Sequence, residues 1–358
     1  MPALPKLLDI GVRPDDAAQH EARRRLAQLT KPPGSLGRLE DLLVRLCAIQ
    51  GTCPPSLRDP VIFTLAGDHG VVAQGVSAYP QVVTAQMVEN FLNGGAAVNA
   101  LARHAGARVV VADLGVAAAL SQHSALRRCK VGPGTQDMTR GPAMTRAEAL
   151  HAIEAGIALV EDEQARGADL IGTGEMGIGN TTAASALVSA LTGAAPASVT
   201  GPGAGVDEDG RRRKVETGRR ALEVNRPDPA DPLETLAKLG GFEIAGLVGV
   251  ILAGAVHRLP VVLDGFIAGA AALVAARLKP DIRPALIAAH RSSEPGHARV
   301  LDDLGLEPYL DLGMRLGEGT GAALCIGLAR AACAVFTEMA TFKSAGVSDR
   351  PHLPGASS

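Results

Sequence analysis

The chain has 358 residues, with 35 Lys and Arg against 37 Asp and Glu, so its net charge of -2 gives no electrostatic reason to expect nucleic acid or an anionic membrane as a partner. Trp is absent and only 2% of the residues are aromatic, which leaves few rings to stack on exposed bases. The length suffices for one large α/β domain and a smaller one. We therefore expect a globular protein that binds small molecules and neither nucleic acid nor membrane.

The cysteine pattern favours a reducing compartment. The five Cys are an odd number and include no Cys-x-x-Cys pair, which is typical of free thiols in the cytoplasm. Asp9, Arg13 and Asp15 interrupt the N-terminus before any secretory signal can form. The apolar run 244–256 is too short and too rich in Gly and Ala to span a bilayer, so we predict a buried helix there.

The rhythm of apolar residues changes along the chain. Residues 15–50 read as helices around a break at 31–35, and from Pro60 short β-branched runs alternate with Ala-rich helical stretches. After about residue 300 helices return, ending in 321–340 and a polar tail. This pattern predicts an α/β fold with a mostly parallel sheet, and strands at 61–65, 108–112, 169–171, 260–263 and 285–289.

The predicted domains follow from the same pattern. Residues 60–300 form the large α/β domain in this prediction. Residues 1–59 and 301–358 are helical, and we expect them to join as one small domain.

Unusual polar residues follow each predicted strand. In an open parallel sheet the ligand crevice lies beyond the carboxyl ends of the strands, so these segments should line one cleft. They are Gly67-Asp-His-Gly70, Asp113-Leu-Gly115, Gly172-Thr-Gly-Glu-Met-Gly177, Asp264-Gly265 and His290-Arg-Ser-Ser-Glu-Pro-Gly-His297.

Gly172–Gly177 formally matches the dinucleotide pattern G-x-G-x-x-G before the predicted helix 180–191. The acidic residue expected about 20 positions later is missing, however, and Glu175 would repel a pyrophosphate. The segment from Gly174 to Thr181 also resembles a Walker A loop with Asn180 in place of Lys. Backbone N–H groups at Gly174 and Gly177, with Asn180 and Thr181, are suited to one phosphate group. A monophosphate is thus favoured, although a glycine-rich turn without function stays open.

Two further segments carry candidate ligand groups. His290, Glu294 and His297 invite a metal interpretation, but Pro295 and Gly296 prevent a common helical face, so Ser292, Ser293 and Arg291 read rather as hydrogen-bond donors to a phosphate or ribose. The second is a Gly-rich loop followed by Gln86, which could close over an apolar ring.

Asp68-His69 and the basic run Arg211–Lys214 each allow two interpretations. His69 could contact ligand polar groups, but we favour the view that it ties its loop down. Such a basic run usually lies on a solvent-exposed face of a helix. Four positive charges in a nearly neutral chain can nevertheless attract a phosphate ester toward its binding site.

Glu318 is the most informative residue. It stands between Gly317 and Gly319 at the start of an apolar helix, where flanking glycines let a ligand approach closely. A carboxylate among apolar groups has its proton affinity raised toward the range of a general base. The plain alternative is a first-turn Glu that complements the helix dipole.

An ordered series of motifs strongly resembles the nicotinate-nucleotide:dimethylbenzimidazole phosphoribosyltransferase family. The series runs from about residue 31 to 342 and comprises Lys31-Pro-Pro-Gly-Ser-Leu-Gly-Arg-Leu-Glu40, Ala66-Gly-Asp-His-Gly70, Gly174-Glu-Met-Gly-Ile-Gly-Asn-Thr-Thr182, Gly240-Gly-Phe-Glu-Ile-Ala245, Asp264-Gly-Phe266, 290–297 and Arg315-Leu-Gly-Glu-Gly-Thr-Gly321. The resemblance implies a Rossmann-like large domain, a homodimer, and a role in making the lower-ligand nucleotide of cobalamin.

The resemblance also implies a reaction and a set of site residues. The reaction transfers 5-phosphoribosyl from nicotinate mononucleotide to 5,6-dimethylbenzimidazole and inverts the anomeric carbon, without metal or other cofactor. Glu318 would be the general base and Glu175 its polar partner in the site. Substrate contacts would come from Gly174, Gly177, Asn180, Thr181, Lys214, Asp264, Ser292 and Ser293, with Gln86 and Leu316 beside the benzimidazole.

One stretch departs from the family pattern. Thr200-Gly-Pro-Gly-Ala-Gly205 stands where relatives often read Gly-Arg-Gly-Thr-Gly, which makes the role of Lys214 less secure. Two rival hypotheses come from other classes: a non-catalytic nucleotide sensor that uses the same loop, and a nicotinamide-dependent dehydrogenase.

Overall fold

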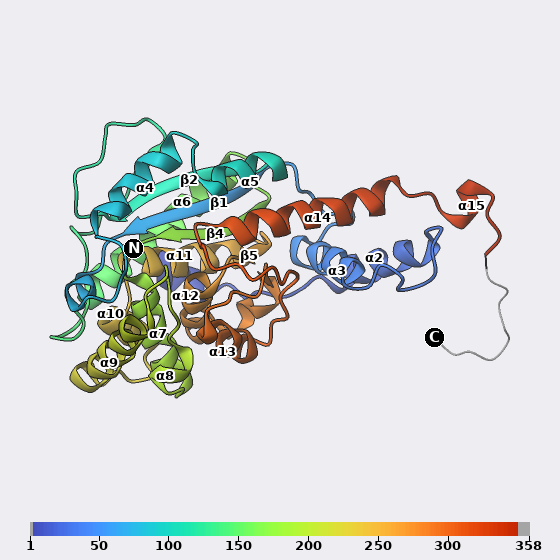
Figure 1. Ribbon diagram of the computed structural model, residues 1–358. Coiled ribbons are helices and arrows are strands. Elements are labelled where there is room, and N and C mark those ends of the chain that lie inside the picture. The colour runs from blue at the N-terminus through green and yellow to red at the C-terminus, as the bar shows by residue number, and fades with distance from the viewer. Residues whose placement is uncertain (1–2, 350–358) are drawn as a thin grey trace. The chain divides into compact units, whose positions relative to one another are not determined.

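The computed structural model describes residues 3–349, and its central element is a six-stranded sheet in the order β3-β2-β1-β4-β5-β6, with every strand pair parallel (Figure 1). The predicted α/β fold with a parallel sheet is confirmed. The strands are β1 (Pro60–Gly67), β2 (Arg108–Gly115), β3 (Leu126–Arg128), β4 (Leu170–Met176), β5 (Val261–Leu263) and β6 (Leu286–Ala288).

Helices connect and cover the strands. Their bounds are α1 (Ala3–Leu8), α2 (Asp16–Gln28), α3 (Arg38–Gln50), η1 (Gly70–Gln74), α4 (Val82–Leu92), α5 (Ala97–Ala105), α6 (Arg146–Ala165), α7 (Asn180–Thr192), α8 (Pro196–Val199), α9 (Glu208–Asn225), α10 (Pro232–Leu239), α11 (Phe242–Val256), α12 (Phe266–Leu278), η2 (Pro280–Ala285), α13 (Pro295–Leu304), α14 (Thr320–Glu338) and α15 (Phe342–Ala345). The predicted polar tail continues past Asp349, outside the described residues.

The strand order creates a switch point between β1 and β4. From β1 the chain moves outward through β2 and β3, and then returns to add β4, β5 and β6 on the other side of β1. The chain therefore continues from β1 toward one edge of the sheet and from β4 toward the other edge. In such a sheet a crevice opens beyond the carboxyl ends of the two strands at which the direction changes. The fold thus favours a ligand site next to the end of β4.

Glycine lets the buried helices pack closely. A Cβ on Gly156 of α6 would overlap the Gly246 carbonyl oxygen, and a Cβ on Gly249 of α11 would overlap the Ile153 carbonyl oxygen. The two backbones therefore touch directly, and α11 in turn packs on β1, β2, β4 and β5. The prediction of a buried helix at 244–256 is confirmed, since Phe242–Ala255 are all buried.

The chain divides into two compact units. One contains the residues up to Arg13 together with Leu57–Gly327, and the other contains Pro14–Ser56 together with the chain from Leu328 onward. These divisions differ from the sequence-based boundaries at 59/60 and 300/301. The second unit has its own apolar core, formed by Ala18, Ala22, Leu26, Leu29, Leu43, Val44, Cys47, Ala332 and Phe336.

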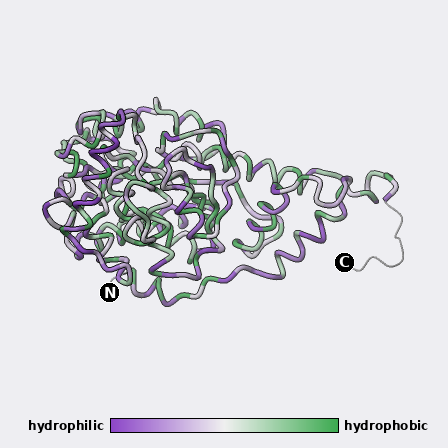
Figure 2. Tube along the Cα trace, turned by 60° about the horizontal axis from the view of Figure 1, so that its bottom comes forward, coloured by the Kyte–Doolittle hydropathy of each residue, from purple (hydrophilic) through white to green (hydrophobic). Residues whose placement is uncertain are grey.

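Figure 2 shows hydrophobic and hydrophilic segments alternating along the trace of the sheet unit. Among residues 3–349, α14 is the one helix long and apolar enough to cross a membrane, judged by length and composition only, and half of its apolar window is buried within the fold. That burial is typical of a core helix.

Candidate active site

A cavity of about 680 Å³ lies at the carboxyl edge of the sheet, within the unit that contains the sheet. The segments after β4, β5 and β6, the loop before α14 and the start of α4 line it. The lining residues are Tyr79, Val83, Met87, Glu175, Met176, Gly177, Ile178, Asn180, Thr181, Gly203, Ala204, Gly265, Phe266, Ile267, His290, Ser292, Glu294, Arg315, Leu316, Gly317 and Glu318.

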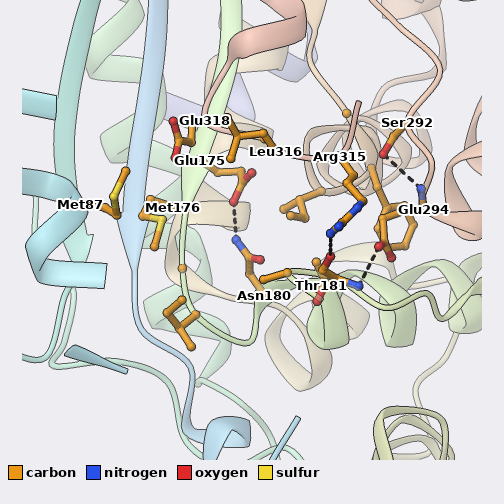
Figure 3. Close-up of a pocket in the computed structure, with 18 of the residues that line it drawn as sticks. Met87, Glu175, Met176, Asn180, Thr181, Ser292, Glu294, Arg315, Leu316 and Glu318 are labelled. Atoms are coloured by element: carbon orange, nitrogen blue, oxygen red, sulfur yellow. Dashed lines mark hydrogen bonds between the residues drawn. The ribbon is translucent and has the colours of Figure 1, made fainter. Parts of the chain in front are cut away.

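The two ends of this cavity differ in character. Figure 3 shows Glu175 and Glu318 close to Met87 and Met176, which we call the carboxylate end. Thr181, Ser292, Glu294 and Arg315 gather farther along, which we call the polar end. An apolar ring fits beside the methionines, and hydroxyl and guanidinium groups at the other end fit an anion.

Glu318 is a buried carboxylate with an unused oxygen. It is 7% exposed, and its Oε2 has no hydrogen-bond partner among the described residues. Burial, with a smaller effect from the Asp264 carboxylate, raises the pKa of Glu318 to about 7. At that pKa the side chain can take up a proton near neutral pH, as a general base must.

The backbone at Glu318 is strained and tightly enclosed. Its φ of 66° lies in the left-handed region, which a non-glycine residue seldom adopts. The main-chain oxygen of Glu318 accepts a hydrogen bond from Thr64 Oγ1 at 3.0 Å, and a Cβ on Gly174 would overlap that same oxygen. Gly174 therefore supports the site by leaving room for the Glu318 backbone.

Asp264 holds the loop that carries Glu318. Its Oδ1 accepts the N–H groups of Gly321 at 2.6 Å and Ala322 at 3.1 Å, and its Oδ2 accepts that of Gly319 at 3.0 Å. The first N–H groups of a helix lack partners within the helix, so this carboxylate satisfies the start of α14 from another segment. Asp264 lies behind the cavity and is not among its lining residues.

Glu175 is the second carboxylate at this end. Its Oε2 accepts a hydrogen bond from Asn180 Nδ2, and a Cβ on Gly317 would overlap its Oε1. Burial, followed by the negative charges of Asp264 and Glu243, raises the pKa of Glu175 to about 8, although the hydrogen bond from Asn180 opposes the rise. Glu175, like Glu318, therefore releases its proton nearer to neutral pH than an ordinary glutamate does.

The polar end is organised around the backbone of one residue, Gly203. Glu294 Oε1 accepts the N–H of Gly203 at 2.8 Å, while Arg315 Nη1 donates to the Gly203 carbonyl oxygen at 2.7 Å. Ser292 Oγ accepts a weak hydrogen bond from the Glu294 N–H at 3.3 Å, so its own proton can be donated into the cavity.

Lys214 lies beneath this loop. Its Nζ donates to Thr181 Oγ1 at 2.9 Å, and a Cβ on Gly203 would stand 2.7 Å from Nζ. Burial lowers the pKa of Lys214 to about 8, although the Glu294 carboxylate opposes this effect. Lys214 therefore reaches the cavity through the hydroxyl of Thr181, and Gly203 covers its ammonium group.

The His290–His297 segment does not form a metal cage. His297 Nδ1 accepts the Ser292 N–H at 2.9 Å, and His290 Nε2 lies 3.8 Å from Asp264 Oδ1. Burial lowers the pKa of His297 to about 3, so it stays neutral as an acceptor. Within residues 3–349, no group of three or more His, Cys, Asp or Glu side chains is arranged to hold a metal ion.

Comparison with known proteins decides the family. Residues 12–347 match a family model described as phosphoribosyltransferase. Nicotinate-nucleotide–dimethylbenzimidazole phosphoribosyltransferase from Roseiflexus sp. strain RS-1 is 57% identical over 336 residues, which cover 94% of this chain and 95% of the relative. The chain belongs to this phosphoribosyltransferase family. It is accordingly an enzyme that transfers a phosphoribosyl group.

Other relatives agree. The enzyme of the same name from Chloroflexus aggregans is 56% identical over 336 residues, covering 94% of this chain and 95% of that protein. The crystal structure of CobT from Thermus thermophilus superposes with a TM-score of 0.89 at 50% identity, covering 93% of this chain and 99% of that one. The Rossmann-like fold expected from the resemblance is thus the fold of its relatives.

The structure brings together many of the residues that the resemblance named. Seven of them line one cavity: Glu175, Gly177, Asn180, Thr181, Ser292, Leu316 and Glu318. Gly174, Lys214 and Asp264 lie directly behind that lining. Gln86 and Ser293 are both exposed outside it, although Val83 and Met87, on the same helix α4 as Gln86, do face the cavity.

The sequence analysis gave no role to several lining residues. Arg315 had been quoted within a motif and Glu294 had been weighed only as a metal ligand. Their pairing with Gly203 could not be predicted from spacing, because Gly203 is 91 residues from Glu294 and 112 from Arg315. His69 proved to be tied to Glu243 at 2.6 Å and does not line the cavity. Its favoured interpretation, that it ties the loop down, agrees with this contact.

Proposed function

We propose that the enzyme transfers 5-phosphoribosyl from nicotinate mononucleotide to 5,6-dimethylbenzimidazole, with Glu318 as the general base. The observation that carries this proposal is that Oε2 of the buried Glu318, at the carboxylate end of the cavity, has no hydrogen-bond partner among the described residues. The names of the relatives, which specify these two substrates, support it. The product, α-ribazole 5′-phosphate, would enter assembly of the cobalamin nucleotide loop.

The proposed chemical step is a single displacement. Glu318 takes the N–H proton of the benzimidazole, and the other ring nitrogen attacks the anomeric carbon of the ribose. The bond from that carbon to the pyridinium nitrogen breaks, and its electron pair returns to the ring of the departing nicotinate. Attack from the face opposite nicotinate inverts the carbon from β to α.

No metal is needed for this departure, because the cationic pyridinium becomes neutral as it leaves. Within the cavity the benzimidazole would lie against Met87, Met176 and Leu316, and the phosphate would lie at the polar end. There Thr181, Ser292 and Arg315 present donors, and the N-terminus of α7 adds a partial positive charge.

The direct test uses purified protein with nicotinate mononucleotide and 5,6-dimethylbenzimidazole in the presence of a metal chelator. We expect ribazole phosphate and nicotinate in equal amounts by chromatography and mass. Folded protein that releases nicotinate only when another base is supplied would instead indicate a different acceptor. Tight binding of NADH would revive the dehydrogenase hypothesis, which the family assignment otherwise disfavours.

Replacing Lys214 with Ala is expected to raise KM for nicotinate mononucleotide about tenfold or more, with a smaller effect on KM for the base. Loss of a hydrogen bond from a charged donor costs about 1.5–3 kcal/mol, and this one orients Thr181 at the polar end. Steady-state kinetics with each substrate varied in turn measures both constants. Arg212→Ala, an exposed cation two positions earlier on α9, is the matched control. Equal changes in both constants would show that Lys214 does not serve the phosphate.

Two further features are proposals. We propose that the enzyme is a homodimer, as the resemblance implies, and that it acts in the cytoplasm, as its five Cys without a Cys-x-x-Cys pair favour. Sedimentation velocity of the purified protein tests the first, since a species of twice the chain mass of 36.6 kDa is expected.

A further inference from the structure

A buried threonine joins two walls of the cavity. Thr84, in the first turn of α4, is 0% exposed, and its Oγ1 accepts the N–H of Ile178 at 3.1 Å. The two residues are 94 positions apart in the chain. Ile178 lines the cavity, in the turn between β4 and α7. The hydroxyl of Thr84 has no part in the proposed reaction.

Helix α4 forms one wall at the carboxylate end of the cavity. Val83 and Met87 line it. Thr84 follows Val83 directly and lies three positions before Met87, so it is next to Met87 on the helix surface. The outer side of the helix is open to solvent, since Val82 is 52% exposed. A displacement of α4 at Thr84 therefore moves both lining residues.

The turn 177–179 is held in place from behind. A Cβ on Gly177 would stand 2.4 Å from the Gly67 carbonyl oxygen, and a Cβ on Gly179 would stand 2.8 Å from Val72 Cγ2. Gly179 also has a φ of 94°, in the left-handed region that favours glycine. The turn therefore packs tightly against the end of β1 and against η1. It offers a fixed point to which α4 can be attached.

Hydrogen bonds anchor α4 near both of its ends. Near the end of the helix, the carboxylate of Glu89 accepts the N–H of Ser121 at 2.8 Å and its Oγ proton at 2.7 Å, at an exposed position. Near the start, Thr84 accepts the N–H of Ile178. Among residues 3–349, no other hydrogen bond joins α4 to the turn 177–179. The wall next to the cavity thus depends on Thr84.

Loss of the Thr84 hydroxyl would leave the N–H of Ile178 without an acceptor. Ile178 is 7% exposed, and a buried N–H without a partner is unfavourable. Because the turn is held from behind, the change that satisfies this N–H is a displacement of α4 that lets water reach it. Such a displacement widens the space between Met87 on one wall and Met176 on the other.

We propose that Thr84 is a positioning residue that sets the width of the acceptor pocket, by tying the wall of Val83 and Met87 to the turn at Ile178. A pocket held at this width favours a bicyclic azole whose methyl groups reach the wall over the same ring without them. This inference rests on the proposed function, in which the base lies at the carboxylate end. Thr84 itself does not line the cavity, so it acts through its neighbours.

The binding test is Thr84→Val, which keeps the shape of the side chain and removes the hydroxyl. We expect the Kd of 5,6-dimethylbenzimidazole, measured by isothermal titration calorimetry, to rise about three- to tenfold, with a smaller rise for unmethylated benzimidazole. In steady-state kinetics KM for the acceptor should rise in the same way, while KM for nicotinate mononucleotide stays unchanged. Thr84→Ser retains the hydroxyl and should keep the wild-type preference for the methylated base.

A matched control comes from the surface. Thr337 is an exposed threonine of α14, and its Oγ1 donates to the Cys333 carbonyl oxygen of the same helix at 2.9 Å. Thr337→Val should leave every Kd and KM unchanged. In Thr84→Val, equal rises for the two bases, or for the acceptor and nicotinate mononucleotide, would overturn the proposal, because a general loss of structure has that effect. Wild-type constants in folded Thr84→Val would overturn it as well.

A second readout depends on neither turnover nor ligand. Hydrogen exchange at the Ile178 amide, followed by NMR of ¹⁵N-labelled protein, should be faster in Thr84→Val than in the wild type and in Thr84→Ser. If Thr84→Val does not fold, Thr84→Ala lacks the same hydroxyl with less bulk and should show the same changes. Unchanged exchange in folded variants refutes the inference even in an active enzyme. A wild type that forms no ribazole phosphate, with faster exchange in Thr84→Val, refutes the proposed reaction and its acceptor but not the tie between Thr84 and Ile178.

Discussion

Replacing Glu318 with Gln is expected to lower kcat by about two to four orders of magnitude, the range for a lost general base. The amide has nearly the same shape and tolerates the same left-handed backbone, but it cannot take up the proton of the attacking base. Kinetics of ribazole phosphate formation measures the loss. Circular dichroism and thermal melting should match the wild type, because Oε2 has no hydrogen-bond partner to lose among the described residues.

The pH profile adds a second signature of the same residue. The base must be ionised in the free enzyme, so kcat/KM of the wild type should rise with pH through about 7 and then level off. Glu216→Gln, an exposed control on α9, should keep both rate and profile. Near-normal kcat in Glu318→Gln would remove Glu318 from the mechanism.

Asp264→Asn should combine a loss of stability with a loss of rate. One oxygen of Asp264 becomes an amide nitrogen that cannot accept from Gly319 or Gly321, and a buried donor is left facing another donor. We expect a lower Tm, from a destabilisation of about 1–3 kcal/mol, and kcat reduced roughly ten- to a hundredfold as the Glu318 loop shifts. Thermal denaturation and steady-state kinetics measure the two effects.

The same variant also changes the charge near Glu318. The Asp264 carboxylate contributes to the raised pKa of Glu318, so its removal should move the acid limb of kcat/KM to lower pH. Asp302→Asn, on the exposed side of α13, is the control and should change none of these quantities. Wild-type Tm together with wild-type kcat in Asp264→Asn would show that the loop does not depend on this carboxylate.

Much of this fold was readable from local patterns. The strands β1, β2, β4, β5 and β6 contain apolar runs that are followed by Gly or by a polar residue, and the parallel order follows from the helices between them. The strand β3 was missed because it has three residues, two of them Arg, and it pairs only with the end of β2. Such a short edge strand forms because it hydrogen-bonds to its neighbour. Its own sequence has no pattern that predicts a strand.

The candidate site was readable where chemistry is local in sequence. Glu318 between two glycines signalled a place that a ligand can approach closely, whereas the left-handed φ of Glu318 was not predicted. The role of Asp264 was not readable, because it depends on three N–H groups more than 50 residues away. The position of Gly203 over the ammonium group of Lys214 likewise depends on tertiary packing, so it could not be predicted from the sequence.

The most direct test of the proposed transfer by single displacement is the anomeric configuration of the product made by the wild-type enzyme from β-nicotinate mononucleotide. Proton NMR of purified ribazole phosphate should show the α-linked nucleotide, as displacement from the face opposite nicotinate requires. A β-linked product would contradict single displacement, and no product from folded enzyme would contradict the proposed reaction itself.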